Sequence, residues 1–292
     1  MPTQDAMPQP TIPVRGQVQK TFVDRLVLAG YTDKNHFLML VGEYLSTLNE
    51  EEQKLLLNKL QAAQNYVSTL QPKDISNVEL GTISNTYISE LESDTIFRNA
   101  FGNTSHRFSY VNPSNIIALQ PWIVQRRDTI PTDENELMKF AFPKEWDVPA
   151  EINFIPPQGP IQILSSSPLF SNLAIEFDTA NGKVQLGPPK HLNLIQISHF
   201  QDKYYLRNGY HRVADAVASG IERLPALVID AFNPTDVQLT GPAFFGFGYI
   251  SKLPRPPLVA DFHTQAAVAT KVRERRYGMI VSLDVKQINI GI

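Results

Sequence analysis

The chain reads Arg207-Asn208-Gly209-Tyr210-His211-Arg212, followed directly by Val213-Ala214-Asp215-Ala216-Val217-Ala218-Ser219-Gly220. A glycine after a strand-like segment, then polar residues and a short apolar stretch closed by a second glycine, predicts a strand, a turn and a helix. A helix N-terminus presents unpaired N–H groups and the positive end of the helix dipole, so it attracts phosphate or carboxylate. His211 and Arg212 add an imidazole and a planar set of donors at the same place. The stretch therefore predicts an anion-binding turn.

Length and composition limit the classes of protein to consider. The chain has 292 residues, 42% hydrophobic and 19% charged, as expected of a globular protein with a full core. The formal net charge of −3 argues against a broad nucleic-acid-binding surface, which needs a basic excess. The absence of cysteine excludes disulfides, thiolate metal sites and a cysteine nucleophile. The six histidines lack the spacing of a zinc site, so we expect no metal.

A tail and a helical domain are expected in the first third of the chain. Residues 1–20, rich in Pro, Gln and Thr, are expected to form a disordered tail. Apolar spacings of three and four residues predict a helical domain over residues 21–104, with one helix capped by Asn49 and ended by Pro72 and another from Ser84 to Asn99. No run reaches the ~18 apolar residues that a membrane span needs. We therefore expect a cytoplasmic protein.

A strand-rich domain with a C-terminal extension is predicted over residues 105–292, with the boundary near 102–108. Its strands are predicted from β-branched and aromatic runs, among them Tyr110-Val111, Ile116–Leu119, Tyr204–Arg207 and Leu224–Ile229. Asn181-Gly182 lies between two such runs and predicts an inserted β-hairpin. A basic helix is expected from Thr264 to Tyr277. The fold class predicted is α+β: an N-terminal helical region, then a mixed sheet with short helices.

Three segments carry a resemblance to a known superfamily. They are Pro188-Pro189-Lys190-His191 through Ile195, Tyr204 through Arg212, and Gly220 through Val228 with its Leu224-Pro225 entry. Their order resembles the ParB/sulfiredoxin superfamily, in which a strand begun by two prolines leads to a second strand, a G-x-H-R or G-x-R-R turn, a helix and a further strand. The better match covers about residues 188–230, with a weaker one at 108–122 around Val111-Asn112-Pro113. The resemblance implies a ParB/sulfiredoxin-like sheet.

The resemblance also implies a ligand. In sulfiredoxins the His and Arg of this turn bind ATP phosphates, and in ParB proteins the equivalent turn binds CTP phosphates. Gly209, His211 and Arg212 are the matching positions here, and Asn208 and Tyr210 complete the expected ligand-binding turn. Tyr210 stands where sulfiredoxin has its catalytic cysteine, which excludes sulfinic-acid reduction. Ala214 stands where ParB proteins usually have a further arginine.

The leading hypothesis is therefore a ParB-like protein that binds a nucleotide or another phosphate-bearing small molecule, either ATP or CTP with magnesium, as a phosphotransferase or a nucleotide hydrolase. No catalytic residue can be named from the sequence. Arg126 and Arg127 are expected to add anion contacts or to form a solvated face. On this hypothesis Arg212→Ala removes ligand binding and leaves the unliganded melting temperature nearly unchanged.

Two alternatives remain open. In the first, the chain is a non-enzymatic interaction protein that keeps the fold as a scaffold and binds a partner through its helical N-terminal domain. In that case Arg212 pairs with a carboxylate such as Asp215 or Glu222. In the second, it is a DNA-binding partition-type protein, which the acidic charge and the lack of a helix-turn-helix pattern after residue 230 disfavour.

Overall fold

The computed structural model describes residues 22–125, 129–144, 151–154, 161–165, 174–178, 183–187, 192–237, 241, 243–273 and 277–281. The expected tail at 1–20 and the pair Arg126-Arg127 lie outside the described residues. The described part combines helices with antiparallel and mixed sheets, as the α+β prediction requires.

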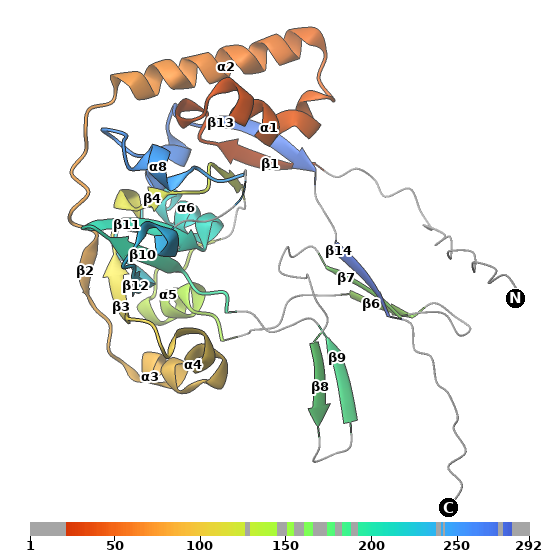
Figure 1. Ribbon diagram of the computed structural model, residues 1–292, viewed down its shortest axis with the longest axis vertical. Coiled ribbons are helices and arrows are strands. Elements are labelled where there is room, and N and C mark those ends of the chain that lie inside the picture. Colours follow the sequence, from red (N-terminus) through yellow and green to blue (C-terminus); the bar gives the residue numbers. More distant parts are fainter. Residues whose placement is uncertain are drawn as a thin grey trace, which may run out of the picture.

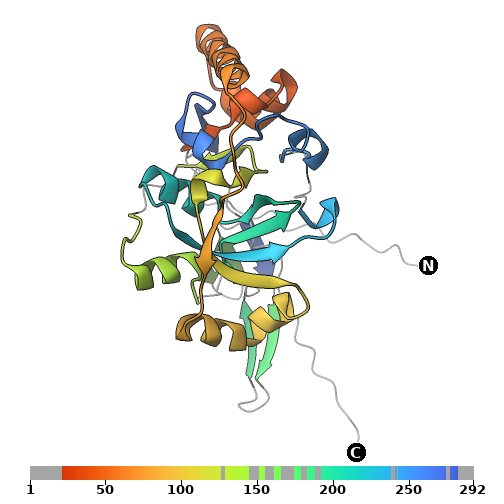
Figure 2. The ribbon, with the colours of Figure 1, turned by 90° about the vertical axis from the view of Figure 1, so that its left-hand side faces the viewer.

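The centre of the molecule is a six-stranded sheet in the order β2-β3-β12-β10-β11-β4. Figure 2 shows it with helices on either side. It is mixed: β10 pairs in parallel with β12, and β11 with β4, while the other neighbours are antiparallel. The strands are β2 (Glu79–Thr82), β3 (His106–Val111), β4 (Ile117–Ala118), β10 (Gln196–Phe200), β11 (Lys203–Asn208) and β12 (Leu224–Asp230).

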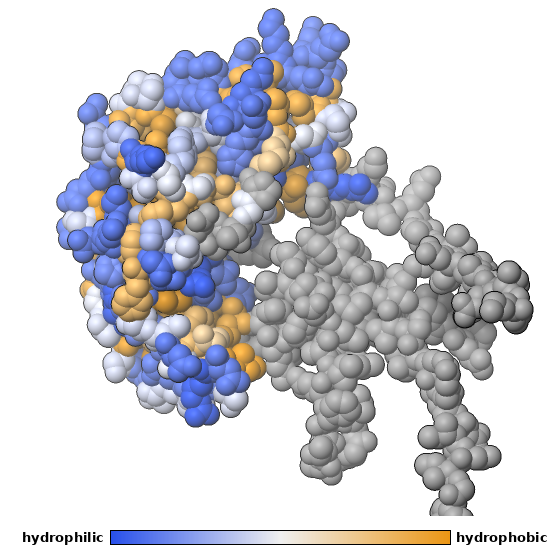
Figure 3. All heavy atoms as spheres, in the orientation of Figure 1, coloured by the Kyte–Doolittle hydropathy of each residue, from blue (hydrophilic) through white to orange (hydrophobic). Residues whose placement is uncertain are grey.

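A second sheet, in the order β13-β1-β5, is built from β1 (Phe22–Val27), β5 (Trp122–Val124) and β13 (Val268–Arg273). Helices α1 (Lys34–Leu45) and α2 (Glu50–Thr69) lie against it (Figure 1). Helix α2 starts at a capping box in which Asn49 and Glu52 bond each other's backbone N–H groups, and it ends at Thr69, shortly before Pro72, so this predicted helix is confirmed. Figure 3 shows hydrophilic residues along the outer side of α2.

The remaining described elements are short. The helices are α3 (Thr86–Ser93), α4 (Thr95–Phe101), α5 (Glu134–Ala141), α6 (Tyr210–Ala218), α7 (Pro234–Val237), α8 (Phe247–Ile250) and the 3-10 turns η1 (Ala29–Tyr31), η2 (Pro113–Asn115) and η3 (Val259–His263). β6 (Glu151–Phe154), β7 (Ile161–Ser165) and β14 (Tyr277–Val281) form a third sheet. β8 (Ala174–Asp178) and β9 (Lys183–Gly187) pair antiparallel, which confirms the two paired strands of the predicted β-hairpin. No described helix has the length and apolarity required to span a membrane.

The prediction that residues 21–104 are all helical was wrong, because this segment also holds β1 and β2. In β1, Leu26 faces the main core while Val27 faces the smaller core beneath α1 and α2. A strand buried on both faces lacks polar alternation, and its apolar spacing then also fits a helix. The expected helix at 84–99 is two helices, because Asp94 ends α3 and its side chain caps α4.

The expected helix from Thr264 to Tyr277 was also wrong, because β13 occupies its middle. Val268 and Thr270 are buried while Ala269 and Lys271 are not, which is the alternation of a strand, and the segment pairs with β1 over six residues. Lys271 therefore belongs to a strand and not to a basic helix. The spacing of the basic residues in this segment also fits the polar face of a helix, which explains the wrong prediction.

The predicted domain boundary near 102–108 does not separate two cores. One hydrophobic cluster includes Ile88 and Phe97 from before the boundary and Phe108 and Leu227 from after it. Strand β2, from the expected helical domain, pairs with β3 of the central sheet. Residues on both sides of position 105 therefore contribute to the same core.

Candidate functional site

The turn singled out by the sequence connects β11 to α6 at one end of the central sheet, as predicted. Gly209 adopts the left-handed conformation, with φ 89° and ψ 22°, and its carbonyl accepts the first helical hydrogen bond from Val213. A Cβ at this position would also lie 3.0 Å from Cγ1 of Ile195. Both the backbone conformation and the space therefore call for glycine.

Asn208 fixes the approach to this turn. Its side-chain nitrogen donates to the carbonyl of Leu194 at 3.1 Å, and its side-chain oxygen accepts from the Gly209 N–H at 2.9 Å. These bonds tie the end of β11 to the segment before β10. They use the side-chain groups of Asn208 to hold the backbone in place.

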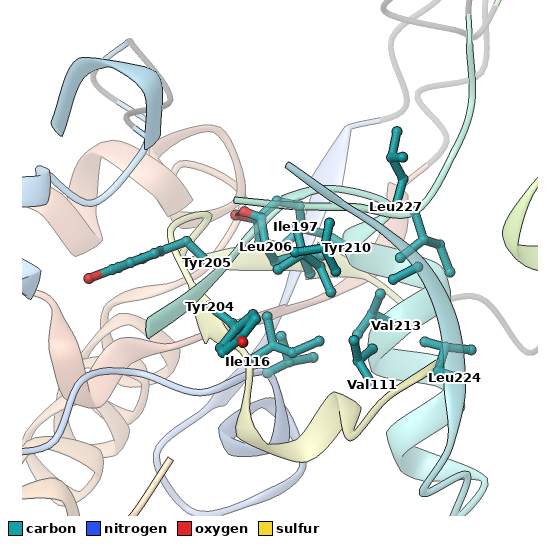
Figure 4. Close-up of a cluster of buried hydrophobic side chains, with 14 of the residues drawn as sticks. Val111, Ile116, Ile197, Tyr204, Tyr205, Leu206, Tyr210, Val213, Leu224 and Leu227 are labelled. Atoms are coloured by element: carbon teal, nitrogen blue, oxygen red, sulfur yellow. Dashed lines mark hydrogen bonds between the residues drawn. The ribbon is translucent and has the colours of Figure 1, made fainter. Parts of the chain in front are cut away.

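Tyr210 points into the protein. Its side chain is buried among apolar residues of the core, including Ile197 and Leu206 (Figure 4). Its hydroxyl donates to the carbonyl of Leu206 and accepts from the N–H groups of Leu119 and Gln120 at 3.1 and 3.2 Å. Burial raises the pKa of the Tyr210 hydroxyl. Its aromatic ring and hydroxyl therefore serve the fold and are screened from a ligand.

His211 lies beside β5. Its Nδ1 accepts the N–H of Val124 at 3.1 Å, and its ring lies 6.3 Å from the ring of Trp122. An Nδ1 that accepts a hydrogen bond carries no proton, so the neutral ring has its proton on Nε2. The contact also places the turn beside the last residue of β5, two positions before Arg126. Because Nδ1 of His211 accepts a hydrogen bond, Nε2–H is the donor of the neutral ring.

Arg212 is held by the protein itself. One terminal nitrogen donates to the carbonyls of Phe140 and Ala141 at 2.8 and 3.3 Å, and the other to the backbone and side-chain oxygens of Asn193 at 2.7 and 3.0 Å. Phe140 and Ala141 end α5, where carbonyls lack partners inside the helix. Arg212 thus joins three segments: α5, α6 and the residues before β10.

A buried cation, Arg25, lies against Trp122. Arg25 of β1 is 4% exposed, and its guanidinium carbon lies 5.6 Å from the centre of the Trp122 ring. It donates to the carbonyl of Leu40, and burial lowers its pKa to about 10. Within the described residues no carboxylate lies within ion-pair distance of it. The charge of Glu43 acts on this guanidinium and raises its pKa against the effect of burial, so the positive potential of Arg25 is partly offset.

A separate polar network lies at the opposite end of the central sheet, where sequence reasoning found nothing. Arg107 pairs with Glu79 and with Asp230, and Asp230 also accepts from Ser105 at 2.7 Å. His199 lies 3.1 Å from Asp230 through Nδ1. Its members are far apart in the chain, so only the strand register brings them together, and no motif could have revealed them.

No group of three or more potential ligand side chains that could hold a metal occurs in the part of the chain that the structure describes.

The predicted residues Asn208 to Arg212 lie at the junction of β11 and α6. Comparisons of the chain with protein-family models, with curated proteins and with solved structures found no match.

Proposed function

We propose that this chain is a ParB/sulfiredoxin-like protein that binds a nucleotide or another phosphate-bearing small molecule at the Asn208–Arg212 turn. The observation that carries the proposal is the left-handed Gly209, which starts a nine-residue helix directly at the end of a central strand. The first N–H groups of such a helix have no acceptor within the helix, and the dipole favours a negative charge in front of them.

The residues of the turn take different roles in this proposal. Backbone N–H groups of the first turn of α6 and the Nε2–H of His211 contact the phosphate. Arg212 positions the turn through its bonds to Phe140 and Asn193. Arg25, against Trp122, contributes positive potential at longer range, which Glu43 partly offsets. Arg126 and Arg127 follow β5, whose last residue bonds His211, and they remain proposed additional contacts.

A thermal-shift screen of ATP, CTP, GTP and inorganic phosphate, each with magnesium, tests the proposal. A ligand at 100 times its dissociation constant stabilises the folded state by about 2.7 kcal/mol, which is measurable. If none of the four shifts the melting temperature at millimolar concentration, the proposal fails.

Two substitutions of His211 separate the ligand contact from the structural contact. The side-chain oxygen of Asn can replace Nδ1 as the acceptor for Val124, whereas the side-chain nitrogen of Gln can replace Nε2 as a donor. His211→Asn is expected to keep the unliganded melting temperature and to lose most of the ligand-induced shift. His211→Gln is expected to keep the shift and to lose about 1 kcal/mol of stability. The reverse pattern would contradict the proposed contact.

A second candidate function is a non-enzymatic interaction protein, and one observation favours it. Met39 on α1 and Leu55 on α2 are 49% and 56% exposed, so both helices present apolar side chains that a partner could cover. The side chains of Tyr210 and Arg212, moreover, are used within the protein. A wild-type protein with no ligand-induced shift in the screen would favour this candidate.

A further inference from the structure

The second polar network lies where two parallel strands end. β10 and β12 run in parallel, and their last paired residues are His199 and Asp230. In β10, Gln196 pairs with Asn208 beside the Gly209 turn, and His199 pairs with Tyr204 at the far end. The network is therefore at the opposite end of the sheet from the proposed phosphate site. The carboxyl ends of parallel strands are a common place for ligand sites.

Asp230 is held firmly as a carboxylate. It accepts hydrogen bonds from Ser105 at 2.7 Å and from Arg107 at 2.6 Å. The bonds from Arg107, Ser105 and His199 together outweigh desolvation and lower the pKa of Asp230 to about 2. At neutral pH this carboxylate can only accept hydrogen bonds. The proton of the His199–Asp230 contact must therefore reside on Nδ1 of His199.

This assignment leaves the lone pair of His199 on Nε2. The imidazole of His199 is stacked on the ring of Tyr204, with 4.6 Å between the ring centres, and the Tyr204 hydroxyl donates to Glu79 at 2.8 Å. Asp230 and Tyr204 therefore both restrict the orientation of the imidazole. The side chain is 28% exposed. Within the described residues, the only hydrogen bond of the His199 side chain is the one from Nδ1. An aspartate that fixes the tautomer and an accessible Nε2 are the arrangement of a general base.

We propose that His199 is a general base that activates water against an uncharged carboxylic ester, with Asp230 as its positioning residue. The water oxygen attacks the acyl carbon while one water proton passes to Nε2. The ester C–O bond then breaks, and the proton on Nε2 passes to the leaving oxygen. The products are a carboxylic acid and an alcohol, and Nε2 is again unprotonated, so the step needs no other reactant.

The charge of the network supports an uncharged substrate. Arg107 contributes one positive charge, and Glu79 and Asp230 contribute two negative charges, which leaves −1 with a neutral imidazole. This charge disfavours phosphate anions. Phe232, two residues after Asp230, is 80% exposed, in a turn where Asp236 accepts from the N–H groups of Phe232 and Asn233. The N–H of Ala231, the residue before Phe232, donates to the carbonyl of His199 at 2.8 Å, so Phe232 follows the backbone beside the base, and we assign its ring as the apolar contact for the substituent of the ester.

Hydrolysis of p-nitrophenyl acetate by the full chain tests this proposal independently of phosphate binding. His199→Gln is expected to lower the rate constant about 100-fold, the lower range for a positioned base. His263→Gln is the matched control, because His263 Nε2 contacts the carbonyl of Ala214 at 2.9 Å and the Gln nitrogen can do the same. An unchanged rate in His199→Gln, with circular dichroism showing a folded variant, would overturn the proposal.

The tautomer of His199 provides a second test that does not depend on activity. Nitrogen-15 NMR of the wild-type imidazole is expected to show the proton on Nδ1. Asp230→Ala removes the acceptor of the Nδ1 proton, so the preference for the Nδ1–H tautomer is expected to be lost, and the rate constant falls as in His199→Gln. A wild-type ring protonated on Nε2, or an unchanged rate in a folded Asp230→Ala variant, would contradict the assigned base.

Discussion

Replacement of Arg212 by alanine is expected to destabilise the empty protein, contrary to the expectation from the sequence. The side chain donates to three backbone carbonyls and to the side chain of Asn193. Hydrogen bonds from a charged donor contribute about 1.5–3 kcal/mol each and are not additive, and a partly buried carbonyl that loses its donor adds a desolvation cost, although the Ala141 carbonyl keeps the N–H of Ile195. We expect a loss of about 3 kcal/mol in the free energy of unfolding.

Urea denaturation followed by far-UV circular dichroism measures this loss. Arg207→Ala is the matched control, because Arg207 lies on β11 and is exposed, so its removal is expected to change stability by less than about 0.5 kcal/mol. Arg212→Lys keeps the charge but not the planar fork, so an intermediate loss is expected. A loss below about 0.5 kcal/mol in Arg212→Ala would refute the structural role of the guanidinium.

Three further predictions concern stability. In urea denaturation, Gly209→Ala is expected to lower the free energy of unfolding by about 1 kcal/mol more than Gly220→Ala. Both glycines have positive φ, but only at Gly209 does the added Cβ lie 3.0 Å from another atom. Equal losses in the two variants would contradict this close contact. Asp261→Asn is expected to cost about 3–5 kcal/mol, since Asp261 is 1% exposed and receives two bonds from Arg255; a melting temperature equal to wild type would exclude this role. Asp230 has its pKa lowered to about 2, below the ~3.9 of an unfolded aspartate, so its contribution of about 1 kcal/mol is present above pH 4 and disappears between pH 4 and 2. The free energy of unfolding of Asp230→Asn should therefore fall less steeply between pH 4 and 2 than that of the wild type. Equal slopes in the two proteins would contradict the ion-pair network.

Local signals predicted the parts of the fold that depend on neighbouring residues. Asn49 before three glutamates specified the start of α2, and Gly209 between a strand and an apolar stretch specified the turn into α6. These features act through a few residues along the chain, which is why the sequence reveals them.

Other elements depend on partners far along the chain. β1 is a strand because β5 and β13, about 100 and 245 residues later in the sequence, pair with its two edges. The contacts of Arg212 could not be foreseen for the same reason, since α5 was not recognised in the sequence and its terminal carbonyls are 71 and 72 residues away. Residue types indicated where a charge would lie, but not which acceptors would surround it.

The central claim is that phosphate binds in front of the first turn of α6. The most direct measurement is a titration of the nitrogen-15-labelled full chain with ATP, CTP or inorganic phosphate, each with magnesium, followed through the backbone amide signals. The account predicts that the largest chemical-shift changes fall on the amides of Tyr210, His211 and Arg212, and that they are strongly reduced in His211→Asn. Binding that leaves these three amides unchanged, or no binding by any of the three ligands, would contradict it.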